Sequence, residues 1–249
     1  MLKLIVCDWN GTLFRDRLEE SFFRGLCIEA ARCALASKSL RRVSSLIPAF
    51  LKAFREYQSA KVRPEKMLGH IGRIVDILNP KVFATLTREQ VENYTLGYAR
   101  KNVSQLDPRM LEPLSKLCCE KKIPIGVISS GCKLGIEKTL ELGGYKMDFI
   151  TANDFKFPPD SDAPGFEFSV TDNKGALLRE IAAKQKVSLA EILYIGDALP
   201  DEECFKLAGF AAVSFFADTQ SRLRFAKSAN AKYFKNQKQF EEYLAKIAC

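Results

Sequence analysis

Residues 7–13 read Cys-Asp-Trp-Asn-Gly-Thr-Leu and directly follow the apolar run Leu2-Lys-Leu-Ile-Val. The apolar run predicts a buried β-strand, which places Asp8 at the carboxyl end of that strand, before a turn that contains Gly11 and Thr12. In open α/β sheets, ligands bind outside the carboxyl ends of the strands. A carboxylate held there among backbone N–H groups can attack a phosphoryl group. This loop therefore predicts a reactive site at Asp8.

The second half of the chain alternates between helical and strand-like segments. The alternation begins at Asp107-Pro108, a pair typical of a helix N-cap and first helical position. Helical patterns cover residues 108–120, 134–142, 174–185 and 202–208, and short apolar runs cover 123–129, 149–150, 192–195 and 210–215. Such alternation predicts an α/β fold with a parallel sheet covered by helices on both faces.

Residues 15–103 show helical patterns and no convincing strand. These patterns cover residues 18–36, 40–60, 64–78 and 88–102, and Pro48 is expected to interrupt the second of them. We therefore predict a core formed by residues 1–14 and 104–249, with residues 15–103 inserted as a helical cap that can act as a lid. A smaller β-hairpin extension is expected between Phe155 and Val170, where two aromatic runs flank a proline-rich turn.

The composition is that of a globular protein, with 249 residues and 47% hydrophobic side chains. No apolar stretch approaches the roughly 18 residues that a membrane span needs, and no signal peptide is recognised, so a cytoplasmic location is expected. The eight cysteines include no Cys-x-x-Cys pair, and His70 is the only histidine. The composition therefore argues against a Cys/His zinc site, and we interpret the cysteines as small buried hydrophobes and His70 as structural.

The formal charge of +8 is distributed unevenly. The segment 38–66 carries a net charge of +6, because only Glu56 and Glu65 oppose eight basic residues: Lys38, Arg41, Arg42, Lys52, Arg55, Lys61, Arg63 and Lys66. Its apolar residues recur at helical spacing: Val43, Leu46, Ile47, Phe50, Leu51 and Phe54. This pattern predicts an amphipathic helix with a basic outer face, which could attract an anionic metabolite, lipid or nucleic acid. The alternative is a solvated helix face without a partner.

Further polar groups follow other predicted strands. The strand Ile125–Ile128 leads into Ser129-Ser130-Gly131, and the strand Ile192–Ile195 leads into Gly196-Asp197 with Asp201 four residues on. Lys174 opens a predicted helix. Because the carboxyl ends of parallel strands meet at one edge, these groups are expected to converge with Asp8. A nucleophile, oxygen ligands for Mg²⁺ and donors for phosphoryl oxygens together suit phosphoryl transfer.

The order of these motifs resembles the haloacid dehalogenase (HAD) superfamily. The similarity rests on Asp8-Trp-Asn-Gly-Thr12, Ser129, Lys174 and Gly196-Asp197-x-x-x-Asp201. It is closest to the phosphoserine phosphatase branch (subfamily IB type), which the run Ile150-Thr-Ala-Asn153 also suggests. The resemblance covers residues 1–14 and 104–249 and implies a Rossmann-like core, whereas the cap matches only in position and type.

The resemblance also implies roles. Asp8 would form an aspartyl-phosphate, and Mg²⁺ would be held by Asp8, the backbone carbonyl of Asn10 and Asp197. Asp201 would support the lysine ammonium. The phosphate-binding groups would be Thr12, Ser129, Ser130, Gly131 and Lys174. For Thr12, a role in stabilising the turn remains an equal alternative.

Three positions depart from the family pattern. Asn10 stands where these phosphatases carry a second aspartate, the residue that protonates the leaving group and then activates water. An amide cannot exchange protons in this way, so turnover should be slower by roughly 10²–10⁴-fold while metal binding through the backbone carbonyl survives. Pro200 replaces a polar residue, and Arg17 replaces a substrate-reading glutamate, which argues against phosphoserine as the substrate.

Two hypotheses follow. The first is a Mg²⁺-dependent phosphatase that hydrolyses a small phosphomonoester. The second is a catalytically weakened relative, with Asn10 in place of the acid, that binds an anionic ligand, lipid or nucleic acid through its basic cap. A phospho-acceptor receiver domain is disfavoured by the length of the chain and by the position of Asp8 after the first strand. The oligomeric state is not predicted.

Overall fold

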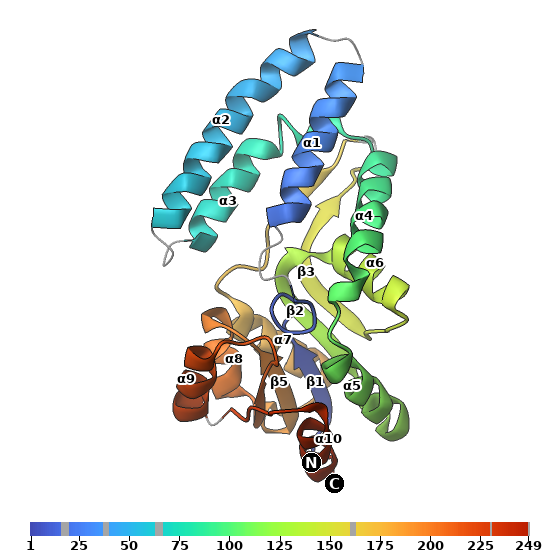
Figure 1. Cartoon of the computed structure of the whole chain (residues 1–249), viewed down its shortest axis with the longest axis vertical. Helices are drawn as coiled ribbons and strands as arrows, with labels where there is room; N and C mark the ends of the chain where they lie inside the picture. The colour runs from blue at the N-terminus through green and yellow to red at the C-terminus, as the bar shows by residue number, and fades with distance from the viewer. Residues whose placement is uncertain (16–19, 37–39, 63–66, 160–162, 230, 249) are drawn as a thin grey trace.

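The computed structural model describes residues 1–15, 20–36, 40–62, 67–159, 163–229 and 231–248, with the backbone alone described at 20, 40–43, 45, 60–62, 67–69 and 71. An α/β body carries the two termini, and a group of long helices extends from it (Figure 1). None of the described helices combines the length and apolarity needed to cross a bilayer. Arg17, Lys38, Arg63 and Lys66 lie outside the described residues.

The α/β body contains a six-stranded sheet in the order β4-β3-β2-β1-β5-β6. Its strands are β1 (Leu4–Cys7), β2 (Ile125–Cys132), β3 (Phe149–Lys156), β4 (Gly165–Glu167), β5 (Ile192–Gly196) and β6 (Phe210–Val213). Neighbouring strands are parallel except for β3 and β4, which form the expected antiparallel hairpin extension. The predicted α/β, Rossmann-like fold class is therefore confirmed.

The register of the sheet brings the predicted motifs to one edge. Cys7 in β1 lies opposite Val127 in β2 and Ile195 in β5. Asp8 follows Cys7 by one residue, and Ser129 and Asp197 follow their strand partners by two. The three strand ends therefore meet at the carboxyl edge of the sheet.

Side chains alternate between the two faces of the sheet, as strand geometry requires. On one face, Ile5 and Cys7 of β1 pack in a core with helices α5 (Pro108–Lys121), α6 (Lys133–Gly143) and α10 (Gln237–Ile247). On the other, Leu4 and Val6 pack with α7 (Lys174–Gln185), α8 (Glu202–Leu207) and α9 (Thr219–Ala229). Helices α9 and α10 were not predicted from the sequence.

The extending helices are α1 (Glu20–Ala36), α2 (Leu40–Val62), α3 (Met67–Leu78) and α4 (Arg88–Asn102), close to the four predicted ranges. The prediction that Pro48 interrupts the second helix was wrong, because α2 continues through it. Proline removes one backbone hydrogen bond from the helix. The burial of Leu46, Ala49 and Ala53 on either side of Pro48 offsets the cost of that loss. Short 3-10 helices cover Phe83–Thr85, Val103–Gln105, Leu189–Glu191 and Leu199–Asp201.

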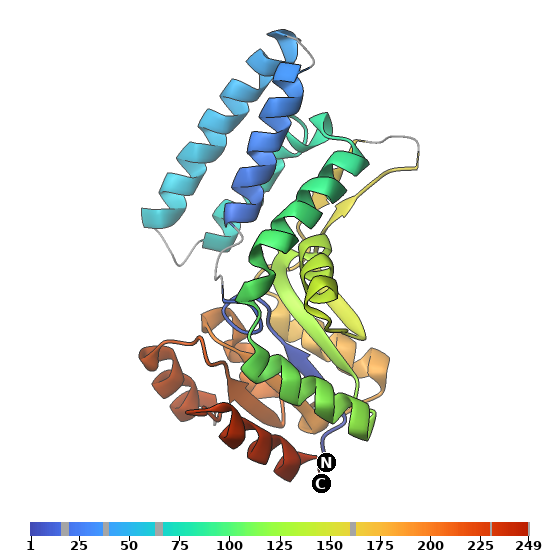
Figure 2. The same ribbon diagram turned by 45° about the vertical axis from the view of Figure 1, so that its right-hand side comes forward.

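An aromatic cluster joins the long helices to the hairpin. Phe23 of α1 packs edge-on against Phe166 of β4 at 4.9 Å between ring centroids, and Phe166 packs against Phe155 at the same distance. Asn79 adds two hydrogen bonds to the backbone of Phe166, one donated at 2.8 Å and one accepted at 2.7 Å. Helix α4 lies beside α6 of the body in both ribbon views (Figures 1 and 2). We propose that residues 15–103 form the inserted cap on a core of 1–14 and 104–249.

In the described parts of the chain, three cysteines are buried as expected, but Cys119 is exposed, and the histidine takes a structural position. The seven described cysteines are free, and Cys7, Cys132 and Cys204 are buried. His70 is 7% exposed on α3, and its Nδ1 lies 2.9 Å from Glu56 Oε2 on α2. His70 therefore links α2 and α3 and belongs to a different part of the fold from Asp8.

Candidate active site

The loop after β1 holds Asp8 in a fixed position. The backbone N–H of Asp8 donates to the carbonyl of Ile195 in β5 at 2.8 Å, and the N–H groups of Thr12, Leu13 and Phe14 all point to the carbonyl of Trp9. Gly11 has φ +72°, and a Cβ there would collide with the carboxylate of Asp197. Only glycine meets both conditions without strain, so the turn packs directly against the second strand-end carboxylate.

Lys174 joins Asp8 to Asp201 through a buried ion-pair network. Its Nζ lies 2.7 Å from Asp8 Oδ1 and 2.8 Å from Asp201 Oδ1. The hydroxyl of Tyr194 donates to the same Asp201 oxygen at 2.7 Å, while Asp201 Oδ2 accepts the backbone N–H groups of Asp197 and Ala198. Because both oxygens of Asp201 are engaged, this carboxylate positions Lys174 and the 197–201 turn.

The protonation of Asp8 is governed mainly by its burial. Removal from water raises the pKa of Asp8 to about 7, against the lowering effect of the Lys174 ammonium and with a further rise from Asp201. Burial alone would lower the pKa of Lys174, but Asp201 and Asp8 outweigh it and hold that pKa above its ordinary value. Lys174 is therefore a permanent cation beside the candidate nucleophile.

A small cavity of about 140 Å³ opens at this point of the sheet edge. It is lined by Asp8, Asn10, Ser130, Thr171, Lys174, Asp197, Ala198, Pro200 and Asp201. Ser129 is fully buried behind this lining, and its Oγ accepts the backbone N–H of Gly131 at 2.9 Å. Of the two serines, Ser130 is the one that lines the cavity, whereas Ser129 shapes the loop that presents it.

Thr12 and Asn10 contribute buried oxygens without partners. Within the described residues, neither Thr12 Oγ1 nor Asn10 Oδ1 has a hydrogen-bond partner. Buried polar atoms are normally paired, so the Asn10 oxygen, which belongs to the cavity lining, marks a place where a ligand would be accommodated. Thr12 is fully buried and is not among the lining residues.

The oxygen-rich surroundings fit a divalent cation. Asp8, Asp197 and Asp201 each offer a carboxylate oxygen, and these atoms lie within 4.8 Å of one another. Mg²⁺ prefers oxygen ligands and retains several waters. Both oxygens of Asp201 are engaged by Lys174, Tyr194 and backbone N–H groups, so Asp8 and Asp197 are the carboxylates better placed to hold the ion. The donor set therefore suits Mg²⁺ between the first and fifth strands.

Three supporting residues were not recognised as such from the sequence. Tyr194 fixes Asp201, and Ser214 Oγ donates to the carbonyl of Gly11 at 2.6 Å. Asn153 donates to the carbonyl of Ser130 at 2.6 Å and accepts the N–H of Val170 at 2.7 Å. Tyr194 lies in β5, and Ser214 directly follows β6. In each case, a polar residue in or beside an apolar run was the only sign in the sequence of a supporting role.

Replacing Asn153 with alanine is expected to lower the free energy of unfolding by about 2–3 kcal/mol, because it removes two buried hydrogen bonds and one partly buried hydrogen bond and leaves backbone groups unpaired. Urea denaturation measures the change. Asn93→Ala, at an exposed position on α4, is the matched control and should change stability little. An equal effect of the two substitutions would contradict a structural role for Asn153.

Replacing Asp8 with asparagine is expected to stabilise the metal-free protein at pH 8. The pKa of Asp8 rises from 3.8 to about 7 on folding, so the folded chain holds a proton that the unfolded chain releases, and stability falls as the pH rises between these values. Asp8→Asn removes this loss of stability, so it should raise the free energy of unfolding by about 2–4 kcal/mol at pH 8 and leave it unchanged near pH 4. Denaturation in chelator-containing buffers across this range tests it, with the exposed Asp76→Asn as control. A difference that does not grow with pH would refute it.

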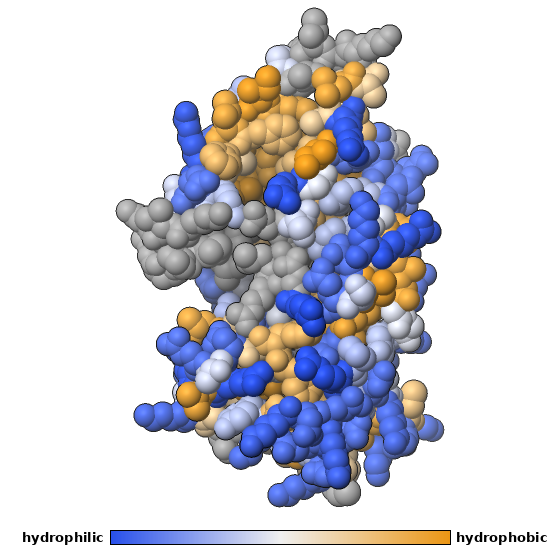
Figure 3. Space-filling model, in the orientation of Figure 1, coloured by the Kyte–Doolittle hydropathy of each residue, from blue (hydrophilic) through white to orange (hydrophobic). Residues whose placement is uncertain are grey.

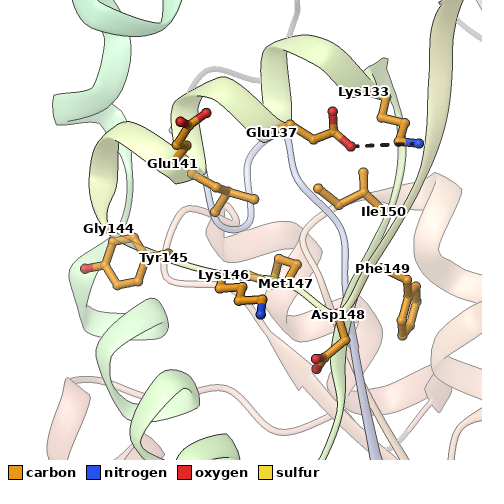
Figure 4. A pocket seen from close by; sticks show the side chains of 11 residues that line it. Lys133, Glu137, Glu141, Gly144, Tyr145, Lys146, Met147, Asp148, Phe149 and Ile150 are labelled. Carbon is orange, nitrogen blue, oxygen red and sulfur yellow. Dashed lines mark ion pairs between the residues drawn. The ribbon is translucent and has the colours of Figure 1, made fainter.

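A larger hollow of about 690 Å³ lies elsewhere, between α6 and the start of β3. Its charged side chains include both signs, and Lys133 pairs with Glu137 at 3.8 Å (Figure 4). Asp148 in its wall accepts the backbone N–H of Ile125 at 2.8 Å. None of the predicted site residues lines this hollow, so the smaller cavity is the one that matches the sequence motifs.

Comparison with known proteins identifies the fold. No protein-family model and no curated protein sequence matches the chain. Among solved structures, a phospho-aspartyl intermediate analogue of phosphoserine phosphatase matches with a TM-score of 0.56 and 20% identity over 97% of this chain and 98% of the other. A protein of unknown function from Bordetella pertussis Tohama I matches with a TM-score of 0.62 and 8% identity, over 94% and 99%. Cytosolic 5'-nucleotidase IIIB bound to cytidine matches with 0.63 and 14%, over 98% and 84%.

Proposed function

We propose, from the fold that this chain shares with phosphoserine phosphatase and other HAD-type hydrolases, that it is a Mg²⁺-dependent phosphatase of a small phosphomonoester. The observation that carries the proposal is the position of Asp8, which lies in a small cavity at the carboxyl edge of the sheet, 2.7 Å from the Lys174 ammonium. A carboxylate nucleophile beside a fixed cation is the arrangement that phosphoryl transfer to a side chain needs.

In the first step, a carboxylate oxygen of Asp8 attacks phosphorus as the bond from phosphorus to the ester oxygen breaks. Lys174 neutralises charge on the transferred group, while Thr12 and Ser130 are the candidate hydrogen-bond donors; the Gly131 N–H would join them only on leaving Ser129 Oγ. Mg²⁺ held by Asp8, Asp197 and the Asn10 carbonyl would offset the repulsion between two anions. In the second step, water attacks phosphorus, and Asp8 and inorganic phosphate are released.

Asn10 limits both steps in this scheme. Its amide lies at the cavity wall, where it can neither protonate the departing ester oxygen nor accept a proton from the attacking water. Esters with good leaving groups need little protonation, so the first step proceeds for them while the second remains slow. We therefore propose that the aspartyl-phosphate on Asp8 persists.

The lining of the cavity bears on the substrate. Pro200 contributes an apolar surface at the mouth of the site and provides no donor or acceptor side chain for a substrate amine. This supports a substrate other than phosphoserine.

Turnover of p-nitrophenyl phosphate tests the proposal. We expect slow Mg²⁺-dependent release of nitrophenol by the wild type, lost on chelation, and activity at background for Asp8→Asn. Leu223→Ser, at an exposed position on α9, is the control for purification and folding. Binding of phosphate without any Mg²⁺-dependent turnover above Asp8→Asn would instead favour the catalytically weakened, anion-binding hypothesis.

A further inference from the structure

Exposed apolar side chains gather on α1 and α2. Five of the ten exposed large hydrophobic side chains in the described chain belong to these two helices, and each is more than half exposed: Ile28, Leu35, Ile47, Leu51 and Phe54. Figure 3 shows hydrophobic surface over this part of the molecule. The other five are scattered over the chain. Gathered apolar surface of this kind marks an interaction site, whereas single exposed residues do not. We call these five side chains the cap patch.

The position of the patch corrects the expectation from the sequence. The apolar residues of α2 were expected to form its inward face beneath a basic outer face. The structure buries Leu46 with Ala49 and Ala53, whereas Ile47, Leu51 and Phe54 point outward at spacings of four and three residues. Helix α2 is therefore apolar on two sides, and its outer stripe has no partner among the described residues.

Cations border the cap patch. Lys52 and Arg55 are exposed on α2, and Arg24 and Arg32 are exposed on α1. Within the described residues, Lys52 and Arg55 form no ion pair. The nearby acids are already engaged, since Glu29 lies 3.6 Å from Arg32, and Glu56 pairs with His70 and Arg73. The surface thus combines aliphatic and aromatic side chains with unneutralised positive charge.

We propose that the cap patch docks the protein onto the surface of an anionic phospholipid membrane. Apolar side chains of an interfacial helix enter the headgroup and acyl boundary, and neighbouring Lys and Arg side chains are attracted to anionic lipid. A second copy of this chain would place two sets of cations against each other, which disfavours self-association. Nucleic acid would satisfy the cations and leave Ile47, Leu51 and Phe54 in water.

Vesicle co-sedimentation tests this proposal. We expect the wild type to bind vesicles that contain phosphatidylglycerol more tightly than vesicles of pure phosphatidylcholine, and to be released as the salt concentration rises from about 0.1 to about 0.5 M. Leu51→Ser and Phe54→Ser should each weaken binding at least ~tenfold. Lys52→Gln and Arg55→Gln should each weaken it roughly fivefold, and only on the anionic vesicles.

The matched control is Leu223→Ser with Lys227→Gln, an exposed apolar and basic pair on α9 that lies outside the cap patch. This control should bind vesicles as the wild type does. Absence of wild-type binding to both vesicle types overturns the proposal, as does binding that Leu51→Ser and Phe54→Ser leave unchanged. A wild-type dimer in sedimentation equilibrium that Phe54→Ser dissociates, without vesicle binding, would assign the patch to a second copy. Salt-sensitive binding to double-stranded RNA, without binding to either type of vesicle, would also overturn the membrane proposal.

Discussion

Replacing Asn10 with aspartate is expected to raise turnover of p-nitrophenyl phosphate by roughly 10²–10⁴-fold. Asn10 lines the cavity that holds Asp8, and among the described residues its Oδ1 has no hydrogen-bond partner, so an acid of the same size fits there without breaking a contact. The new carboxyl can protonate the leaving group and then accept a proton from water. The gain should be larger for an alkyl phosphate than for an aryl phosphate, because the alkoxide needs protonation more.

Two control variants isolate the effect of the acid. Asn10→Ser removes the amide without adding a titratable group and should show no gain. Asp8→Asn combined with Asn10→Asp should remain at background, because the nucleophile is missing. Activity in this double variant, or an Asn10→Asp enzyme no faster than the wild type, would show that Asn10 does not limit the reaction.

Replacing Lys174 with methionine is expected to destabilise the metal-free protein by about 3–5 kcal/mol at pH 8. The substitution leaves Asp8 and Asp201, each at most 5% exposed, without the ammonium that lies within 2.8 Å of both. The pKa of Lys174 is held above its ordinary value, so the ammonium stabilises the fold across the neutral range. Without it, burial and the nearby Asp201 charge favour the protonated form of Asp8, and the loss should shrink as the pH falls to 5.

Guanidinium denaturation at pH 5 and pH 8 measures this change. Lys184→Met, at an exposed position near the end of the same helix, is the matched control and should shift stability by less than about 1 kcal/mol. Adding Asp8→Asn to Lys174→Met should restore part of the loss, since one buried charge is removed. A loss for Lys174→Met that is small, or equal at both pH values, would contradict the buried network.

The sequence was sufficient for the sheet and for the edge at which the motif residues meet. Short apolar runs that end in Asp8, Ser129 and Gly196-Asp197 predict where parallel strands meet, because the chain must cross over between them and all three ends then share one side. The contact of Lys174 with Asp201 was expected only from the family resemblance, because it follows from long-range register, which no local pattern contains. For the same reason the role of Tyr194 was not predicted, because its hydroxyl finds its acceptor only once the fold brings Asp201 beside it.

The helical cap was harder to predict in detail. The apolar residues of α2 do recur at helical spacing, but they lie on two faces of the helix. Only tertiary packing decides that Leu46 is buried while Ile47 and Leu51 are exposed. The predicted break at Pro48 failed for a similar reason, because the packing around this proline compensates for one missing hydrogen bond. Helices α9 and α10 were overlooked, although α10 carries Phe240, Leu244 and Ile247 at helical spacing, and the two helices complete the two faces of the sheet through Phe225 and Phe240.

The central claim is that Asp8 accepts a phosphoryl group which Asn10 then allows to leave only slowly. Rapid mixing of the Mg²⁺-loaded wild type with p-nitrophenyl phosphate, followed by acid quench and peptide mass analysis, tests it most directly. We predict a burst of up to one equivalent of nitrophenol, slow steady-state turnover, and a mass increase of about 80 Da on the peptide that contains Asp8. Linear release of nitrophenol with no adduct on that peptide, and equal activity in Asp8→Asn, would contradict the account.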